Sequence, residues 1–245
     1  MLSKKLIVLF AVFGFAISGC SNSSSGNGGA RVSATSSEAS SMFNSVSELP
    51  KIGDFVEYIE TQDSDSTLTA AQKELLKFCQ KTTASTGDSS NFTSDIEVAG
   101  PGCPISYSLD SQGSKIGGEY SADVNINYQV LNSDFANQVE IQSANCSISL
   151  TGTETEFLNL TGNINCQIVS KTHGAIAVAV SLQMENSLNS SIVTVNATIA
   201  SGAKSAHVSI LVKTNSGIKT TEILINGAPA SDTSDLAALT DLLAM

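Results

Sequence analysis

The spacing of apolar residues changes once along the chain, from a helical period to an extended one. Between residues 42 and 81, apolar residues recur at intervals of three and four, as they do on the buried face of a helix. Pro50 separates a first helix from a second, and Thr69 is a residue type that caps helix N-termini. The helical faces comprise Met42, Phe43, Val46, Ile52, Phe55, Val56, Ile59, Leu75, Leu76, Phe78 and Cys79. We therefore expect N-terminal helices within 42–81 that face a core.

Between residues 119 and 228 apolar and polar residues alternate, which is typical of strands with one buried and one wet face. The first such strand is expected at 122–130, and six more at 138–150, 157–169, 175–184, 191–200, 205–213 and 219–226. The links between them are short and contain Gly or Asn, whereas a parallel crossover needs a dozen or more residues. The pattern therefore predicts an antiparallel meander of about seven strands.

Strand 138–150 contains a fault in its alternation. Val139 and Ile141 occupy odd positions, whereas Cys146 and Ile148 occupy even ones. Since every second side chain of a strand points to the same face, one residue must be absorbed near Ser143-Ala144-Asn145, and we expect a β-bulge there.

Strand 175–184 is apolar on both faces. Branched residues such as Ile176 and Val178 alternate with Ala175, Ala177 and Ala179. We expect this strand near the centre of the sheet, with a helix packed closely on its alanine face.

The expected fold is α+β and mainly β, in one globular domain over 42–245. Residues 82–118 are expected to form a loop, with breakers such as Gly87 and the run Pro101-Gly102-Cys103-Pro104 and at most a short strand at 105–109. A C-terminal helix is expected at 231–245, because leucines recur there at helical spacing. The sheet would thus carry N-terminal helices and a C-terminal helix packed on it.

The first twenty residues have the organisation of an export signal. Lys4 and Lys5 precede an apolar stretch at 6–17, which is too short to span a bilayer. The run Ile17-Ser18-Gly19-Cys20 that follows resembles the lipobox of bacterial lipoproteins. An ordinary cleaved signal peptide that happens to precede a cysteine is the alternative.

The resemblance to a lipobox implies a lipid anchor. In that family residues 1–19 would be removed as the signal peptide, Cys20 would receive a diacylglycerol, and its new amino group would receive an acyl chain such as palmitate. Several acyl chains hold a protein on a membrane far better than one. Ser21 stands where the inner-membrane retention signal of this family has Asp, so the resemblance favours the bacterial outer membrane. Residues 20–41 would then be the lipidated cysteine and a flexible Ser/Gly linker.

Charge narrows the choice of partners. The chain has a formal net charge of −11, and removal of Lys4 and Lys5 would leave ten basic and 23 acidic residues, or −13. Nucleic acid and anionic lipid surfaces both repel such a protein. We therefore expect no nucleic-acid partner, and contact with the membrane through the lipid anchor alone.

Four cysteines remain once Cys20 is lipidated, and four allow three pairings. Export would place them in an oxidising compartment, where disulfides persist. Cys146 and Cys166 share the parity of the apolar residues on two successive strands, so they are expected to form one pair, and Cys79 and Cys103 the other. A zinc site is the alternative, but the chain has no Cys-x-x-Cys motif and two histidines only.

Catalytic motifs are missing from the sequence. It contains no Gly-x-Ser-x-Gly, His-Glu-x-x-His, phosphate-binding glycine loop or EF-hand series. His173 falls in an expected turn and His207 at the start of a strand, so each is interpreted as a surface residue. We expect no enzyme activity and no cofactor; an envelope hydrolase using one of these histidines is the competing hypothesis.

Acidic residues cluster on and after the second expected helix. Asp54, Glu57 and Glu60 share a face, and Asp63 and Asp65 follow. The glycine that turns a calcium-binding loop is missing, so a solvated acidic face is preferred to a divalent-cation site, and no metal is expected.

Uncharged polar residues are the last compositional signal. Ser, Thr and Asn make up nearly a third of the chain, and many fall on the outward faces of strands, where they can bind sugars or a partner's strand.

Two functions follow from these features. The first is a non-enzymatic envelope lipoprotein that binds an apolar ligand between sheet and helices, in a cavity lined by residues such as Ile176, Val178, Val180 and Leu182. The alternative is a surface-displayed adhesive or structural module with a protein or glycan partner. An oligomeric pore is disfavoured, because the strands lack aromatic girdles.

Overall fold

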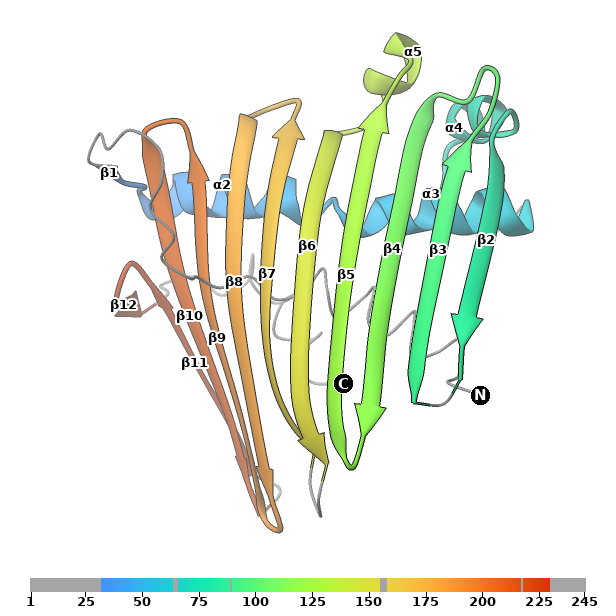
Figure 1. The fold of residues 1–245 in the computed structure, drawn as a ribbon. Helices are drawn as coiled ribbons and strands as arrows, with labels where there is room; N and C mark the ends of the chain where they lie inside the picture. The colour runs from blue at the N-terminus through green and yellow to red at the C-terminus, as the bar shows by residue number, and fades with distance from the viewer. Residues whose placement is uncertain (1–31, 64–65, 89, 155–157, 217, 230–245) are drawn as a thin grey trace.

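The computed structural model describes residues 32–63, 66–88, 90–154, 158–216 and 218–229. Eleven strands lie side by side in chain order, each antiparallel to the next, and a short strand β1 pairs in parallel with β10 (Figure 1). The strands are β1 Val32–Ser33, β2 Gln80–Gly87, β3 Asn91–Ala99, β4 Ile105–Ile116, β5 Glu119–Val130, β6 Ile141–Glu154, β7 Leu158–Ser170, β8 Gly174–Ser187, β9 Ser190–Ser201, β10 Lys204–Asn215, β11 Ile218–Ile225 and β12 Ala228–Pro229. The protein is therefore mainly β, with a meander sheet as predicted.

The sheet has twelve strands, so the prediction of about seven is wrong. The seven expected strands are all present, and β2, β3 and β4 occupy most of the segment 82–118 that was expected to be a loop. Strand β2 forms an edge and is exposed at nearly every position, so it has no apolar alternation to detect. The breakers lie at the ends of strands or between them. Gly87 is the last residue of β2, and the run from Pro101 to Pro104 links β3 to β4.

The details predicted for two inner strands are partly confirmed. The pairing of β6 with β7 shifts register between Ile141 and Ser143, which places the bulge slightly before the expected run. Strand β8 lies near the middle of the sheet. The helix was expected on its alanine face, but Ile176 and Val178 are the buried residues, and Ala177 is only half-buried. The larger side chains remove more apolar area from water, so they face the helices.

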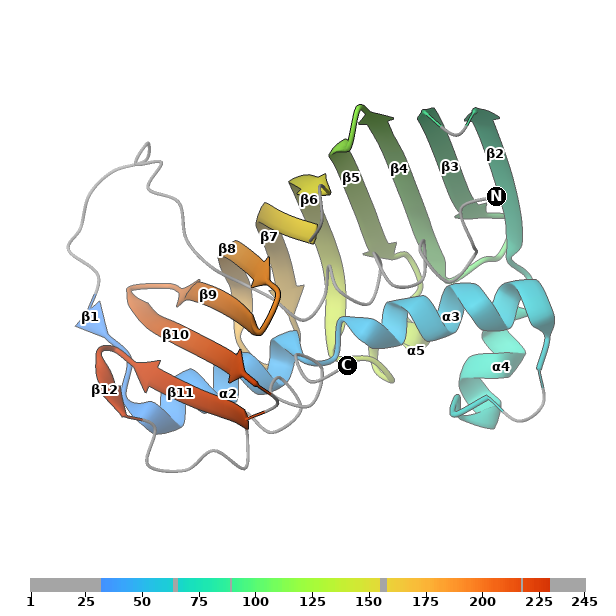
Figure 2. The ribbon, with the colours of Figure 1, turned by 90° about the horizontal axis from the view of Figure 1, so that it is seen from below.

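Two helices cross one face of the sheet end to end: α2 Ser36–Val46 and α3 Pro50–Thr61 (Figures 1 and 2). Their eleven and twelve residues give lengths of about 16 and 18 Å, enough to span about seven strands at ~4.8 Å spacing. Two shorter helices, α4 Ala70–Leu76 and α5 Ser133–Ala136, lie near one end of the pair. Phe55 of α3 packs edge-on against Phe135 of α5, with ring centroids 5.3 Å apart.

Helix α2 begins at Ser36, inside the segment 20–41 that was expected to be a linker. Thr35 caps it: its side chain accepts a hydrogen bond from the Glu38 N–H, and Glu38 accepts one from the Thr35 N–H. Lys204 at the start of β10 also bonds to Glu38, and these contacts hold the pKa of Glu38 at about 2. Polar composition concealed this helix, because Ala39 and Met42, both buried, are the only apolar residues among its first seven.

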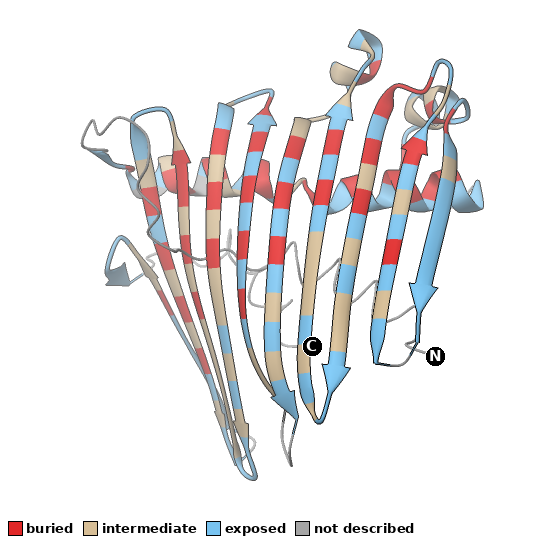
Figure 3. Cartoon of the chain, viewed as in Figure 1, coloured by how far each residue is buried: buried red, intermediate tan, exposed pale blue. Residues whose placement is uncertain are grey.

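The helices cover only one end of the strands, which we call the helix end; its turns include residues 171–173 and 202–203. The opposite end, the far end, holds the hairpin turns at 117–118 and 188–189. Buried residues of β4, β5 and β8 are confined to the half toward the helix end, and those of β6 extend one residue past its midpoint, to Ile148 (Figure 3). The core therefore occupies one end of a long sheet.

Both expected disulfides are present. Cys79–Cys103 joins the start of β2 to the loop before β4, and Cys146–Cys166 joins directly opposed residues of β6 and β7. The Cα atoms of the two pairs are 4.6 and 4.1 Å apart. Each bridge is expected to stabilise the fold by about 2–4 kcal/mol, mainly by restricting the unfolded chain.

Glycines accommodate large neighbours on the helix side of the sheet. Gly113 lies opposite Phe92, and Gly162 opposite Leu150. A Cβ at Gly113 would lie 2.5 Å from the Phe92 ring and 2.9 Å from the Ser121 carbonyl oxygen. The missing side chain is therefore the space that the ring fills.

Gly113→Ala is expected to destabilise the protein by about 1–2 kcal/mol, because the added methyl group overpacks against ring and backbone. Gly53→Ala is the matched control: Gly53 lies inside α3 with open space around its Cβ position, so alanine should stabilise by about 0.5–1 kcal/mol. Urea unfolding of both variants measures these changes. Equal shifts of the same sign would contradict the packing at Gly113.

Candidate functional site

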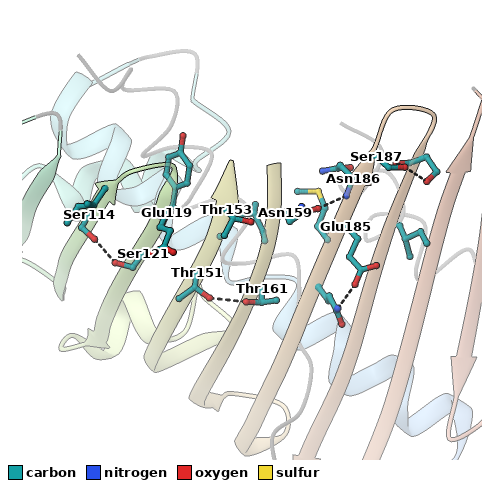
Figure 4. A pocket seen from close by; sticks show the side chains of 18 residues that line it. Ser114, Glu119, Ser121, Thr151, Thr153, Asn159, Thr161, Glu185, Asn186 and Ser187 are labelled. Atoms are coloured by element: carbon teal, nitrogen blue, oxygen red, sulfur yellow. Dashed lines mark hydrogen bonds between the residues drawn. The ribbon is translucent and has the colours of Figure 1, made fainter. Parts of the chain in front are cut away.

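A groove of about 820 Å³ lies at the far end of strands β4 to β9 (Figure 4). Hydroxyl and amide side chains predominate in its wall, together with a few apolar ones. The lining residues are Ser114, Ile116, Glu119, Tyr120, Ser121, Thr151, Gly152, Thr153, Asn159, Leu160, Thr161, Gln183, Met184, Glu185, Asn186, Ser187, Ser190 and Ile192. The groove thus lies at the opposite end of the strands from the core.

A row of polar side chains crosses five strands in this groove. Ser114, Ser121, Thr151, Thr161 and Gln183 are successive partners in the strand register, so they lie on one face of the sheet. Their hydroxyls pair across the strands, with 2.8 Å between those of Ser114 and Ser121 and 2.9 Å between those of Thr151 and Thr161. Strand pairing therefore fixes the spacing of this polar row.

Some lining residues belong to the helix-side face of the sheet, close to the point where the pairing of β7 with β8 ends. Their pairing ends at Leu160 and Met184, and beyond this point the Asn186 N–H donates to the Asn159 side-chain oxygen at 2.7 Å. Leu160, Met184 and Tyr120 belong to the next row, which faces the helix side. The lining residues therefore come from both faces of the sheet at this end of the strands.

Tyr120 is held in place by charged neighbours. Its hydroxyl donates a hydrogen bond to the Glu154 carboxylate, and the Lys115 ammonium lies 4.6 Å from the centroid of its ring. Lys115 also forms an ion pair with Glu154 at 3.2 Å. The ring thus has a fixed position at the groove.

The charged side chains that line the groove are Glu119 and Glu185, and both are acidic and exposed. The Gln183 amide donates to Glu185 at 2.7 Å. Among the lining residues none is Lys, Arg or His. The groove therefore suits a neutral or cationic ligand and disfavours an anionic one.

The side chains expected to line an apolar cavity lie elsewhere. Ile176, Val178 and Val180 are buried in the main core, and Leu182 packs half-buried against it. None of the four lines the groove. Sheet and helices thus interdigitate where an apolar ligand was expected.

The two histidines lie outside the groove. His173 is in the turn before β8, and its Nε2 atom is 3.0 Å from the Ser41 hydroxyl of α2. His207 on β10 has its Nδ1 atom 3.3 Å from the Thr198 hydroxyl. Within the described ranges, no three His, Cys, Asp or Glu side chains are grouped to hold a metal ion. Of the acidic cluster, Glu60 pairs with Lys81, and Asp65 lies outside the described residues.

A carboxylate ties α2 to the sheet beside His173. Glu140 accepts hydrogen bonds from Ser45 of α2, at 3.0 Å, and from Ser170 and Thr172. Burial alone would raise the pKa of Glu140, but these hydrogen bonds outweigh it and hold the pKa below its ordinary value. Glu140 is therefore a structural carboxylate that links α2 to the sheet at the helix end.

Comparisons with known proteins reveal no relative: no family model, curated protein or solved structure matches the chain. In the part of the chain that the structure describes, no helix is long and apolar enough to cross a membrane. The signal segment, Cys20 and the C-terminal helix expected at 231–245 all lie outside the described residues.

Sequence reasoning identified the polar outer face but missed the groove. Period-two alternation indicates which residues of one strand share a face, yet the groove depends on the register between five strands and on the parting of β7 from β8. Tyr120 gave no signal of its own, because it falls just before the first expected strand.

Glu140→Gln is expected to lower the free energy of unfolding by about 1–2 kcal/mol at pH 7, because it removes charge-assisted hydrogen bonds between α2 and the sheet. The lowered pKa means that the wild-type advantage is present above the ordinary pKa and lost as the pH falls through the folded-state pKa. Urea unfolding at pH 7 and pH 3 measures this, with the exposed Glu97→Gln as control. A difference between Glu140→Gln and wild type that is the same at both pH values would contradict the assignment.

Proposed function

We propose that the protein is a non-enzymatic bacterial envelope lipoprotein, anchored through acyl chains on Cys20, that presents the far-end groove to a partner. The anchor rests on the lipobox-like run that ends at Cys20. The partner-binding role rests on where the described domain begins relative to the groove.

Strand β1 begins at Val32 and pairs with Lys204, at the helix end of β10. The twelve residue steps from Cys20 to Val32 would give a flexible linker a mean reach of about 20 Å, roughly half the length of the strands, so the membrane would lie on the side of the helix end. The groove lies at the opposite end of strands of 12 to 14 residues, about 40 Å away. The observation that carries the proposal is that the described domain begins at Val32, at the helix end, whereas the groove lies at the far end.

The net charge favours a position of the domain away from the membrane surface. The mature chain would carry a net charge of −13, with Lys4 and Lys5 removed. An anionic leaflet repels such a body, so it would stand off the surface and leave the groove accessible. Outer-membrane attachment remains the preferred site, on the identity of Ser21.

Binding of an apolar ligand is the second candidate function. Beyond the helices, the helix-side face of the sheet carries half-buried apolar residues packed on the core: Val124, Leu150, Leu182 and Val193. An acyl chain would have to displace this packing, since Ile176 and its neighbours are already in the core. Partner binding at the groove needs no such rearrangement, so it is preferred.

Intact-mass analysis of protein purified from its own envelope tests the anchor. We expect a chain that starts at Cys20 and carries a diacylglycerol and one further acyl chain, and Cys20→Ser should abolish the modification and release the protein from membranes. An unmodified Cys20 in the membrane-derived protein would contradict the proposal.

Native mass spectrometry of the same sample separates the candidate functions. A stoichiometric glycan or protein supports presentation of the groove, whereas a retained lipid supports the apolar-ligand alternative. A protein isolated with neither, and unable to bind envelope components when they are added back, contradicts both.

A further inference from the structure

The composition of the groove points to the chemistry of its ligand. Ten of its lining residues are Ser, Thr, Asn or Gln: Ser114, Ser121, Thr151, Thr153, Asn159, Thr161, Gln183, Asn186, Ser187 and Ser190. Such groups both donate and accept hydrogen bonds, as sugar hydroxyls do. A ligand rich in hydroxyls can therefore form hydrogen bonds with many of these side chains.

The hydroxyls are held in place before any ligand arrives. Thr151 and Thr161 are hydrogen-bonded across β6 and β7, and Ser187 pairs with Ser190 at 2.7 Å across the β8–β9 turn. In each pair one hydroxyl donates to the other, which leaves one hydrogen and several lone pairs for a ligand. Because the pairs are fixed, binding loses less side-chain entropy than it would with free side chains.

Apolar surface alternates with these polar groups. Ile116 and Ile192 line the groove on the face that carries the polar row, where they pair with Glu119 and Glu185 in the strand register. A sugar ring has hydroxyls at its edge and C–H groups on its faces, so it can use both kinds of surface. Ligand sites commonly combine apolar contact area with a small number of placed polar groups in this way.

Two other ligand classes fit the groove poorly. Phosphate-, sulfate- or carboxylate-bearing chains would meet Glu119 and Glu185 with no lining cation to balance them. A peptide added as a strand needs a free sheet edge, but β4 to β9 are paired on both sides, and where β7 and β8 part the Asn186 N–H is bonded to Asn159.

We infer that the far-end groove binds an uncharged oligosaccharide. The polar row crosses five strands, a length of about 19 Å at ~4.8 Å spacing, which accommodates several sugar units in line. Sugar hydroxyls bond to the row, and ring faces lie on Ile116 and Ile192, which line the groove on the same face of the sheet. This inference rests on the proposed function for the presentation of the groove, although binding itself needs the groove alone.

The test uses the full lipidated protein in detergent micelles, applied to arrays of neutral and acidic oligosaccharides. We expect binding to a neutral glycan, measured next by calorimetry. The double variant Thr151→Val/Thr161→Val should lower the affinity at least tenfold, because valine keeps the shape and strand preference but removes both hydroxyls.

Thr86→Val/Thr93→Val is the matched control. This pair also joins exposed threonine hydroxyls across two strands, at 2.7 Å, but it lies on β2 and β3 outside the groove. Affinity should be unchanged in the control. The inference is overturned if the folded protein binds no neutral glycan, if it prefers acidic glycans, or if both double variants lose affinity equally.

The outcomes also separate this inference from the proposed function. A purified protein partner that needs Thr151 and Thr161, with no glycan bound, would overturn the inference and keep the proposed function. A neutral glycan bound by a protein whose Cys20 is unmodified would do the reverse.

Discussion

The packing of α2 and α3 across one end of the strands is the contact on which the rest of the structure depends. A single sheet cannot bury its apolar face unless another layer covers it. Here the cover is two helices laid end to end, which cross the strands near one end and leave the other end uncovered (Figures 1 and 2). The core, with Ile52, Phe55, Ile176 and Ile199 almost fully buried, lies where that cover lies.

The polar contacts between α2 and the sheet lie at the same end. Glu38 bonds to Lys204, Ser41 to His173, and Ser45 to Glu140, so one helix is attached along its length to the turns of the sheet. The far ends of the strands have no such cover and are stabilised by ladder hydrogen bonds, cross-strand hydroxyl pairs and glycines opposite large side chains. Stability and the candidate binding surface therefore occupy opposite ends of the same strands, which lets the far end remain polar and open.

The sequence predicted what alternation and parity encode. Seven strands, the bulge in β6 and the Cys146–Cys166 pair followed from which residues share a face, and Cys79–Cys103 was the pair that remained. Strands with weak alternation were missed. Strand β2 is an exposed edge, and its Gln-Lys-Thr-Thr run has no buried face, so it shows no alternation of apolar and polar residues. The start of α2 was hidden because serines there are compatible with linker and helix alike, and the cap at Thr35 decided between them. The groove could not be found from one strand at a time, since it needs the register of β4 to β9.

Hydrogen–deuterium exchange of the full chain, resolved along each strand, tests the one-ended core most directly. Exchange in ordered regions follows the free energy of local opening, which rises with burial. The account predicts slow exchange toward the helix end of β4, β5, β6 and β8, and exchange at least tenfold faster toward their far ends although both halves are paired in the ladder. Uniform protection from one end of these strands to the other would contradict it.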